Sequence, residues 1–391
     1  MLSVIRRARK SLGHAALAVA ALALAACQPA GSPGTGSALD SSAPVVVALL
    51  VPSGSGQASD ELLARSLQNA ARLAISDLGT TRIDLRVYNT AGQPASAQAM
   101  ATRAIDDGAQ IILGPVFAQE ANAAGAAAAA RGVNVLAFSN NPDIAGGNVF
   151  ILGQTFGNTA DRLAGYAVRN GKPRIMVVHE QNTAGQLGRR AIEQGVARAG
   201  GSVVAVGSYE FSQNGVLSAA PRIAATARDN NADAVFLTAD TAGALPLVSQ
   251  ILNDNGLGPA VTQFIGLTRW DIPQATLGLP GVQGGWFALP DPGRYQQYQN
   301  RYQAAFGEPP HPISGLAYDG IAAIGALLKQ GRTTTLNGQA LTQAAGFVGV
   351  NGIFRLRSDG QNERGLAVAQ IRNNQVVIID PAPRSFGGFG S

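Results

Sequence analysis

The chain has 391 residues, of which 46% are hydrophobic and 14% are charged, a composition typical of a globular protein large enough for two domains. Its formal net charge of +5 includes four basic residues within residues 1–26, and no later cluster of basic and aromatic residues follows. The composition therefore argues against binding to nucleic acid. Because Cys27 is the only cysteine, an intramolecular disulfide is excluded.

The first 27 residues have the pattern of a signal peptide. Four basic residues at positions 6–10 precede an apolar run over residues 15–26 that is too short to span a bilayer. The run ends in LAAC at residues 24–27, which resembles the lipobox of bacterial lipoproteins. This resemblance implies removal of residues 1–26 and lipidation of Cys27, which would anchor the protein on the periplasmic side of the cell envelope. Gln28, in place of an acidic residue, favours the outer over the inner membrane. A chance cysteine after an ordinary cleavage site is the alternative.

Two terminal segments lack hydrophobic periodicity. Residues 27–43 begin with Cys27 and are then rich in Gly, Ser and Pro, so we expect a flexible tether with a reach of roughly 20–25 Å. Residues 381–391 end in SFGGFGS, and a disordered tail is expected there. No run of about 18 apolar residues follows Cys27, so the sequence predicts no membrane-spanning helix.

From residue 44 onward, short apolar runs alternate with segments of helical periodicity, which is the pattern of a doubly wound α/β sheet. The first predicted strands are 45–51, 83–88, 110–113 and 133–138, separated by helices at 61–78, 95–107 and 120–131. The nearly continuous apolar run at 45–51 is typical of a parallel strand that is buried on both faces. These elements predict one Rossmann-like lobe.

A second series of the same kind follows. Its predicted helices are 158–170, 185–199, 217–229 and 242–253, and its strands are 174–179, 203–209 and 234–237. After residue 281 we predict a strand at 284–289, helices at 294–306 and 313–329, and strands at 352–356, 365–371 and 375–379. The helices after residue 290 have no parallel strands of their own, so we expect them to return to the first lobe.

The predicted fold class is therefore α/β, with two Rossmann-like lobes joined by a hinge that the chain crosses several times. We assign residues 44–155 and 289–345 to the first lobe, and residues 156–288 and 346–380 to the second. Such an arrangement predicts a ligand cleft between the lobes.

Five motifs, in this order along the chain, resemble those of type I periplasmic binding proteins of the leucine/isoleucine/valine-binding branch. They are VALLVP (47–52), DDGAQIILGP (106–115), VLAFS (135–139), VVHE (177–180) and AYDG (317–320). The resemblance implies a two-lobed fold that closes on a small ligand. Function on such a fold is decided by the loops at the cleft.

The resemblance places candidate cleft residues on loops that follow strands. They are Ser53, Ser55, Phe117, Gln119, Ser139 and Asn140 in the first lobe, and Glu180, Arg269 and Trp270 in the second. In amino-acid receptors of this branch, an acidic residue and a tyrosine of the second lobe bind the ligand's ammonium group. Here Ala184 stands at the tyrosine position, and the loop at 267–270 lacks the acidic residue. A standard amino acid is therefore a disfavoured ligand, because a buried ammonium group needs a carboxylate partner.

Several of these side chains have a simpler alternative role. Arg269 on a cleft loop is suited to bind a carboxylate or phosphate, and Trp270 to anchor a partner, but packing of Trp270 beneath its own loop is the alternative. For His179, a structural hydrogen bond is favoured over a role at the cleft. Tyrosines at positions 295, 298 and 302 have helical spacing, which favours packing between elements over a stacking platform.

The sequence offers no set of residues for catalysis or metal binding. Only two histidines remain after residue 26, the single cysteine is expected to carry lipid, and no phosphate loop or nucleophile elbow is present. We therefore expect a protein that is not an enzyme and has no metal, cofactor or catalytic residue.

Two functions remain. The altered amino-acid site and the segments at 268–271 and 284–292 resemble lipoproteins that activate penicillin-binding proteins, so our first hypothesis is a regulator of peptidoglycan synthesis whose partner is a peptidoglycan synthase. The alternative is a solute receptor that delivers a small polar or amino-acid-like ligand to an ABC permease. A homodimer is compatible with either function.

Overall fold

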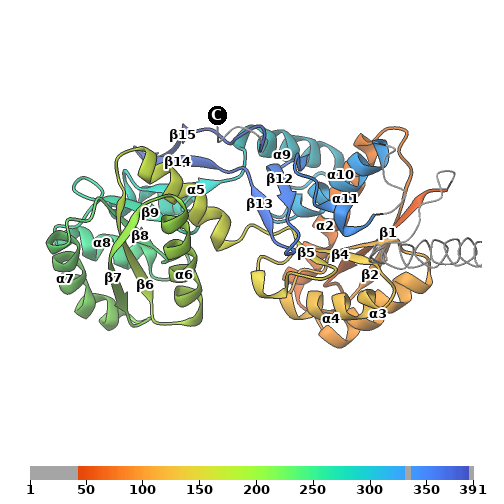
Figure 1. Ribbon diagram of the computed structural model, residues 1–391, viewed down its shortest axis with the longest axis horizontal. Helices are drawn as coiled ribbons and strands as arrows, with labels where there is room; N and C mark the ends of the chain where they lie inside the picture. The colour runs from red at the N-terminus through yellow and green to blue at the C-terminus, as the bar shows by residue number, and fades with distance from the viewer. Residues whose placement is uncertain (1–42, 331–335, 387–391) are drawn as a thin grey trace, which may run out of the picture. The chain divides into compact units, whose positions relative to one another are not determined.

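A computed structural model describes residues 43–330 and 336–386 (Figure 1). The predicted signal peptide, the lipidation site Cys27 and nearly all of the predicted tether lie outside the described residues, as do the last five residues of the predicted tail. In the part of the chain that is described, no helix is both long and apolar enough to cross a membrane.

The first lobe is built on a sheet of five parallel strands in the order β2-β1-β3-β4-β5. The strands are β1 (Val45–Val51), β2 (Ile83–Asn89), β3 (Ile111–Leu113), β4 (Asn134–Ala137) and β5 (Val149–Ile151), and the helices that connect them are α2 (Ala58–Asp77), α3 (Pro94–Asp106) and α4 (Ala118–Ala129). Apolar side chains fill one core on each face of this sheet. The apolar run of β1 is explained by this double burial.

The second lobe is built on a seven-stranded sheet in the order β15-β14-β10-β9-β8-β6-β7. The strands are β6 (Arg174–Glu180), β7 (Ser202–Tyr209), β8 (Ala234–Leu237), β9 (Gln263–Gly266), β10 (Trp286–Leu289), β14 (Ala367–Arg372) and β15 (Gln375–Asp380), with helices α5 (Phe156–Arg169), α6 (Thr183–Arg198), α7 (Gln213–Asp229) and α8 (Leu245–Asp254). The strands from β6 to β10 are parallel, and β14 and β15 extend the sheet in antiparallel fashion. This sheet also has a core on each face.

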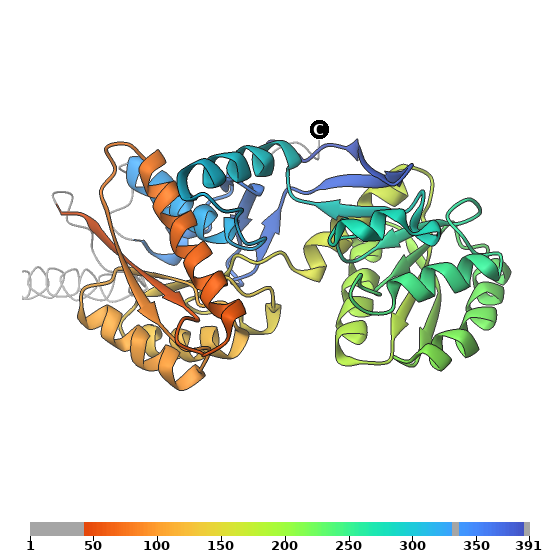
Figure 2. The same ribbon diagram turned by 180° about the vertical axis from the view of Figure 1, so that it is seen from behind.

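The chain then returns to the first lobe, as predicted. Helices α9 (Pro292–Phe306) and α10 (Gly315–Lys329) pack against α2, and Figure 2 shows the teal and blue helices beside the orange one. The short helix α11 (Gly338–Leu341) and a small antiparallel sheet of β11 (Phe347–Gly349), β12 (Gly352–Leu356) and β13 (Asn362–Arg364) follow.

Residues 346–356 differ from the predicted lobe assignment. We predicted that residues 346–380 belong to the second lobe, but Phe347 of β11 and Phe354 of β12 lie in the core that also contains side chains of β1 and α10. The physical reason is that these short strands bury their aromatic side chains on the first sheet, while only β14 and β15 join the second. The remaining lobe boundaries stay a prediction.

The predicted helices and strands are present, and the structure adds four strands that the sequence did not indicate. These are β5, β9, β11 and β13, with three or four residues each, which are too short to show a period. Helix α7 begins at Gln213, four residues before the predicted start, because Ser212 caps a polar first turn by accepting a hydrogen bond from the Gly215 N–H.

A buried ion pair joins α10 to the strands that follow it. Asp319 and Arg364 have side chains that are 0% and 3% exposed, and the Arg364 Nη1 to Asp319 Oδ2 distance is 3.1 Å. The Asp319 carboxylate also accepts hydrogen bonds from the Val350 N–H at 2.8 Å and from the Asn351 side chain at 3.0 Å. Arg364 donates further to the Leu152 carbonyl, at the end of β5. Every charge of this network is compensated inside the protein.

We predict that Asp319→Asn destabilises the fold by about 3–5 kcal/mol, because it leaves the Arg364 guanidinium buried without a negative partner. Urea unfolding measures the change. As a control, Arg103→Gln removes an exposed partner of Asp107 and is expected to cost no more than about 1 kcal/mol. The double variant Asp319→Leu/Arg364→Met should recover part of the loss. Equal costs for Asp319→Asn and the control would contradict this role.

Candidate functional site

In the first lobe, the candidate residues lie on loops at the carboxyl ends of β1, β3 and β4. The turn after β3 requires glycine, because Gly114 has a φ of +89° and a side chain there would collide with the Leu50 carbonyl of β1. Phe117, which precedes α4, lies beside the loop that follows β2. Phe117 is 40% exposed.

The loop after β1 is held by Glu61 of α2. The Ser53 hydroxyl donates to Glu61 Oε2 at 2.6 Å, and the Gly54 N–H donates to Oε1 at 2.6 Å. These hydrogen bonds lower the pKa of the Glu61 carboxyl, the bond from Ser53 contributing most. The Ser53 hydroxyl proton is therefore engaged by Glu61 of α2. The Ser55 hydroxyl accepts from the Gln57 N–H, and among the described residues its own proton has no acceptor.

The other first-lobe candidates are only partly brought together. Ser55 and Phe117 both lie around Gly92, in the loop after β2. Ser139 is buried at the end of β4, where its hydroxyl accepts from the Asn141 N–H at 3.1 Å. Gln119 and Asn140 are exposed. The first lobe thus presents hydroxyl groups and an aromatic edge at the carboxyl ends of its strands.

Sequence reasoning missed Glu120, which lies in the first turn of α4 and is fully buried. Burial raises the pKa of this carboxyl, and contacts with Thr90 and the Phe117 backbone only partly oppose the rise. An acidic residue at a helix N-terminus is favoured by the helix dipole. The pattern of α4 gives no signal for its burial, because a Glu in the first turn is usually exposed.

In the second lobe, Glu180 lies with Tyr209 and Thr238, at the ends of the three adjacent strands β6, β7 and β8. Glu180 is 6% exposed, and the Thr238 hydroxyl is 3.4 Å from its Oε2. Burial raises the pKa of the Glu180 carboxyl, which the Tyr209 and Thr238 hydroxyls only partly oppose. The pKa of Tyr209 is also raised, first by burial and then by the charge of Glu180.

Arg269 and Trp270 are adjacent in sequence but have different surroundings. Arg269 pairs with Asp271 through its Nε, at 2.9 Å from Oδ1, and its Nη2. Trp270 is 0% exposed and belongs to the core of the second lobe, where a side chain at Gly266 or Gly285 would collide with its ring. Its assignment as a cleft residue is therefore wrong, because the ring fills the space that those glycines leave. Packing beneath its own loop is its role.

His179 and the tyrosines of α9 have structural roles. His179 is buried, and its Nδ1 lies 2.8 Å from the Glu180 carbonyl, which is a structural role. Tyr298 and Tyr302 are buried in the first-lobe core and stack edge to face with centroids 5.8 Å apart. The prediction that this stripe serves packing is confirmed.

A cavity of about 170 Å³ lies beside the three segments that connect the two sheets. It is lined by Gln154, Arg269, Ile272, Pro290, Pro312, Ile313, Leu316, Asn351, Arg364 and Leu366. We call it the hinge cavity. Among the predicted site residues it contains only Arg269. Sequence reasoning did not indicate Gln154, Asn351 or Arg364, because they lie far apart along the chain. In the described ranges 43–330 and 336–386, no three His, Cys, Asp or Glu side chains are grouped to hold a metal ion.

Two doubly wound lobes, three connecting segments and a cavity beside them define a type I periplasmic binding fold. The chain belongs to the periplasmic binding protein family, whose sequence pattern matches residues 44–375. The family is one of solute-binding proteins and implies a periplasmic location. No curated protein sequence matches the chain.

Solved structures with the same fold include three with informative descriptions. A proposed branched-chain amino acid ABC transporter from Rhodospirillum rubrum is 18% identical, with a TM-score of 0.72 over 86% of this chain and 100% of that one. A substrate-binding protein from Desulfitobacterium hafniense in complex with Leu is 18% identical, with a TM-score of 0.63 and coverage of 86% and 100%. A solute-binding protein from Rhodopseudomonas palustris in complex with 3,4-dihydroxy benzoic acid is 18% identical, with a TM-score of 0.57 and coverage of 87% and 96%.

These comparisons bear on the two functional hypotheses. The family to which the chain belongs is one of solute-binding proteins, which agrees better with the solute receptor that we held as the alternative, and the solved neighbours are described as proteins of ABC transporters or as solute-binding proteins. They give no support to the activator of penicillin-binding proteins, our first hypothesis. At this identity the neighbours establish the fold of this chain and not its ligand.

We predict that Glu180→Gln reduces the pH dependence of stability. Because the folded pKa lies above the unfolded value, the unfolded chain releases its proton first as the pH rises, so the wild type loses stability until the folded pKa is passed. The variant has no proton to release at this position. Its free energy of unfolding should therefore rise relative to that of the wild type between pH 4 and pH 8, and urea unfolding at both pH values measures the change. Glu210→Gln, at an exposed carboxylate, is the control. An unchanged pH profile in Glu180→Gln would rule out this contribution.

Proposed function

We propose that this protein is the solute-binding receptor of an ABC importer, and that its ligand is a small molecule with a carboxylate group. The observation that carries the proposal is the position of Arg269 in the hinge cavity. A guanidinium has five N–H donors. Asp271 engages two of those of Arg269, and within the described residues the other three have no hydrogen bond.

The lining of the hinge cavity suits a small organic anion. Six of its ten lining residues are apolar, namely Ile272, Pro290, Pro312, Ile313, Leu316 and Leu366. Ligand sites typically combine such walls with a few polar groups that fix the orientation. Arg364, by contrast, is engaged by Asp319 and the Leu152 carbonyl. Of the two arginines that line the cavity, Arg269 is therefore the one with N–H donors available for a ligand.

The lining of the hinge cavity supports a ligand without an ammonium group, because none of its described residues is acidic. Asp271, two residues after Arg269, is already paired with that arginine. It is therefore not free to neutralise a buried ammonium group. Solved neighbours are described in complex with leucine, with 3,4-dihydroxy benzoic acid and with benzoate, and each of these ligands carries a carboxylate. We therefore favour an organic acid over an amino acid for this chain.

Thermal unfolding of the purified protein with benzoate, 3,4-dihydroxybenzoate, branched aliphatic acids and leucine tests the proposal. A ligand at 100 times its dissociation constant should stabilise the fold by about 2.7 kcal/mol, which is a shift of a few degrees in Tm. The amide of each acid is the control, and it should give no shift. If no acid shifts the Tm, the proposal fails, and binding of a peptidoglycan synthase becomes the hypothesis to test.

For an acid that binds, we predict that Arg269→Gln weakens binding by about 10- to 100-fold, the equivalent of one or two hydrogen bonds to a charged group. Isothermal titration calorimetry measures the dissociation constant. Arg198→Gln removes an exposed guanidinium of the same lobe that pairs with Asp161, and it should leave the affinity unchanged. Equal affinities of the wild type and Arg269→Gln would show that the carboxylate is bound elsewhere.

We further propose that the receptor is held at a membrane through a lipid on Cys27, at the outer rather than the inner membrane. Support comes from the apolar run and the LAAC sequence that ends at Cys27. We predict that Cys27→Ala abolishes incorporation of labelled palmitate and moves the protein out of the membrane fraction. Density-gradient separation of the two membranes then locates the wild type. Palmitate labelling that survives the substitution would contradict the anchor.

A further inference from the structure

Strand β7 forms an edge of the second-lobe sheet and lacks the features that usually prevent an edge strand from pairing with another chain. Among the described strands it pairs only with β6, and its eight residues, Ser202–Tyr209, make it the longest of them. The strand contains no charged residue and no proline. Natural proteins usually shorten or charge such edges, because unpaired N–H and C=O groups recruit another strand.

The alternation of the backbone shows which groups of β7 face outward. The Gln181 N–H donates to the Tyr209 carbonyl at 2.9 Å, so Tyr209 directs its backbone groups toward β6. Neighbouring residues of a strand direct theirs to opposite edges, which turns those of Ser208 and Val206 outward. The Val206 side chain is 42% exposed, although it lies within a strand.

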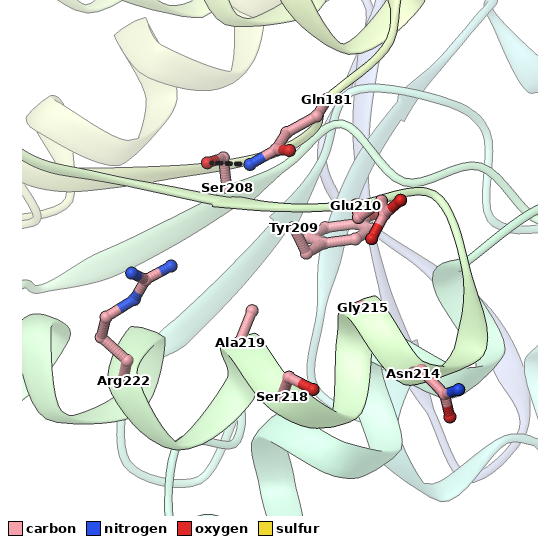
Figure 3. A pocket seen from close by; sticks show the side chains of 9 residues that line it. All are labelled: Gln181, Ser208, Tyr209, Glu210, Asn214, Gly215, Ser218, Ala219 and Arg222. Atoms are coloured by element: carbon pink, nitrogen blue, oxygen red, sulfur yellow. Dashed lines mark hydrogen bonds between the residues drawn. The ribbon is translucent and has the colours of Figure 1, made fainter.

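A second cavity, of about 460 Å³, lies between β7 and helix α7 (Figure 3). We call it the edge groove. Ser208 of β7 and Ser218 of α7 line it, with Arg222 at one end and Glu210 at the other, as Figure 3 shows. Both charged residues are exposed, and within the described part of the chain neither side chain has a hydrogen bond or an ion pair. The groove therefore offers opposite charges to a partner beside the unpaired edge of β7.

We propose that the edge groove binds an extended peptide segment, which adds to β7 as a further strand and places an acidic side chain at Arg222 and a basic one at Glu210. Main-chain hydrogen bonds to an edge strand provide affinity in this mode of recognition, and side-chain pockets provide selectivity. The outward groups of Val206 and Ser208 match a peptide backbone, whereas a free amino acid has no row of such groups. This site is separate from the hinge cavity and does not depend on the proposed function.

Two labelled nine-residue peptides of alternating threonine and valine are suitable probes. One carries glutamate near one end and lysine near the other, and its counterpart has glutamine at both positions. By fluorescence anisotropy the charged peptide should bind about 5- to 10-fold more tightly, as expected for two exposed ion pairs. Arg222→Gln should remove about half of this difference, on a logarithmic scale, without weakening the uncharged peptide.

Backbone pairing is tested with Val206→Pro. An edge strand tolerates proline where the N–H faces solvent, but the outward N–H needed for strand addition is lost. Binding of both peptides should fall below detection, whereas Val206→Thr keeps the N–H and should bind as the wild type does. An unchanged Tm of Val206→Pro, and an unchanged shift with any acid that binds the hinge cavity, show that the fold and that site are intact.

Amide hydrogen exchange locates the bound peptide. The charged peptide should slow the exchange of the Val206 and Ser208 amides in the wild type. The proposal is overturned if neither peptide binds at millimolar concentration, if binding survives Val206→Pro, or if protection falls on another strand. Equally tight binding of free glutamate or lysine would overturn it in favour of a small-molecule site.

Discussion

The buried pair of Asp319 and Arg364 is the interaction on which the arrangement of the first lobe and its connections depends. Its members come from α10 and β13, and its hydrogen bonds reach the turn between β11 and β12 and the Leu152 carbonyl after β5. Two of the three segments that connect the sheets therefore meet at one charge pair. A buried charged side chain is tolerated only when its hydrogen-bonding groups have partners. The ion pair therefore requires all of these segments to lie where they can supply those partners. Gly349 has no side chain because one would collide with the Asp319 carboxylate.

The same constraint shapes the hinge cavity. Arg364 contributes a wall of fixed position, because its guanidinium is held by Asp319 and Leu152 and lies 5.1 Å from the centre of the Phe354 ring. Arg269 differs, since its carboxylate partner Asp271 follows it by two residues and leaves three of its N–H donors without a hydrogen bond in the described chain. One arginine is thus used for structure, and the other keeps the capacity to bind a ligand. The two arginines therefore differ in how many of their N–H donors have hydrogen-bond partners, and not only in their exposure.

The loops at the carboxyl ends of the strands are positioned differently in the two lobes. In the first lobe, backbone geometry at Gly114 and the bonds of Glu61 to Ser53 and Gly54 position the loops. In the second, buried side chains such as Trp270 and Glu180 fill the space beneath them. Strand β7 is the exception, because its outer edge is left open beside two exposed charges of opposite sign. An unpaired edge strand promotes aggregation, so its presence in β7 supports our proposal that a partner strand binds there.

The sequence by itself determined the alternation of strands and helices, the two lobes and the return of α9 and α10 to the first, because apolar periodicity is a local property of the chain. It also indicated Arg269 and the buried tyrosines of α9. Only the tertiary structure decided that Trp270 is core, that Glu120 is buried and that β11 and β12 join the first lobe. It also decided the partner of Asp319, which lies 45 residues away at Arg364. These features depend on what packs against each side chain from distant segments, and burial and charge pairing of that kind leave no local pattern.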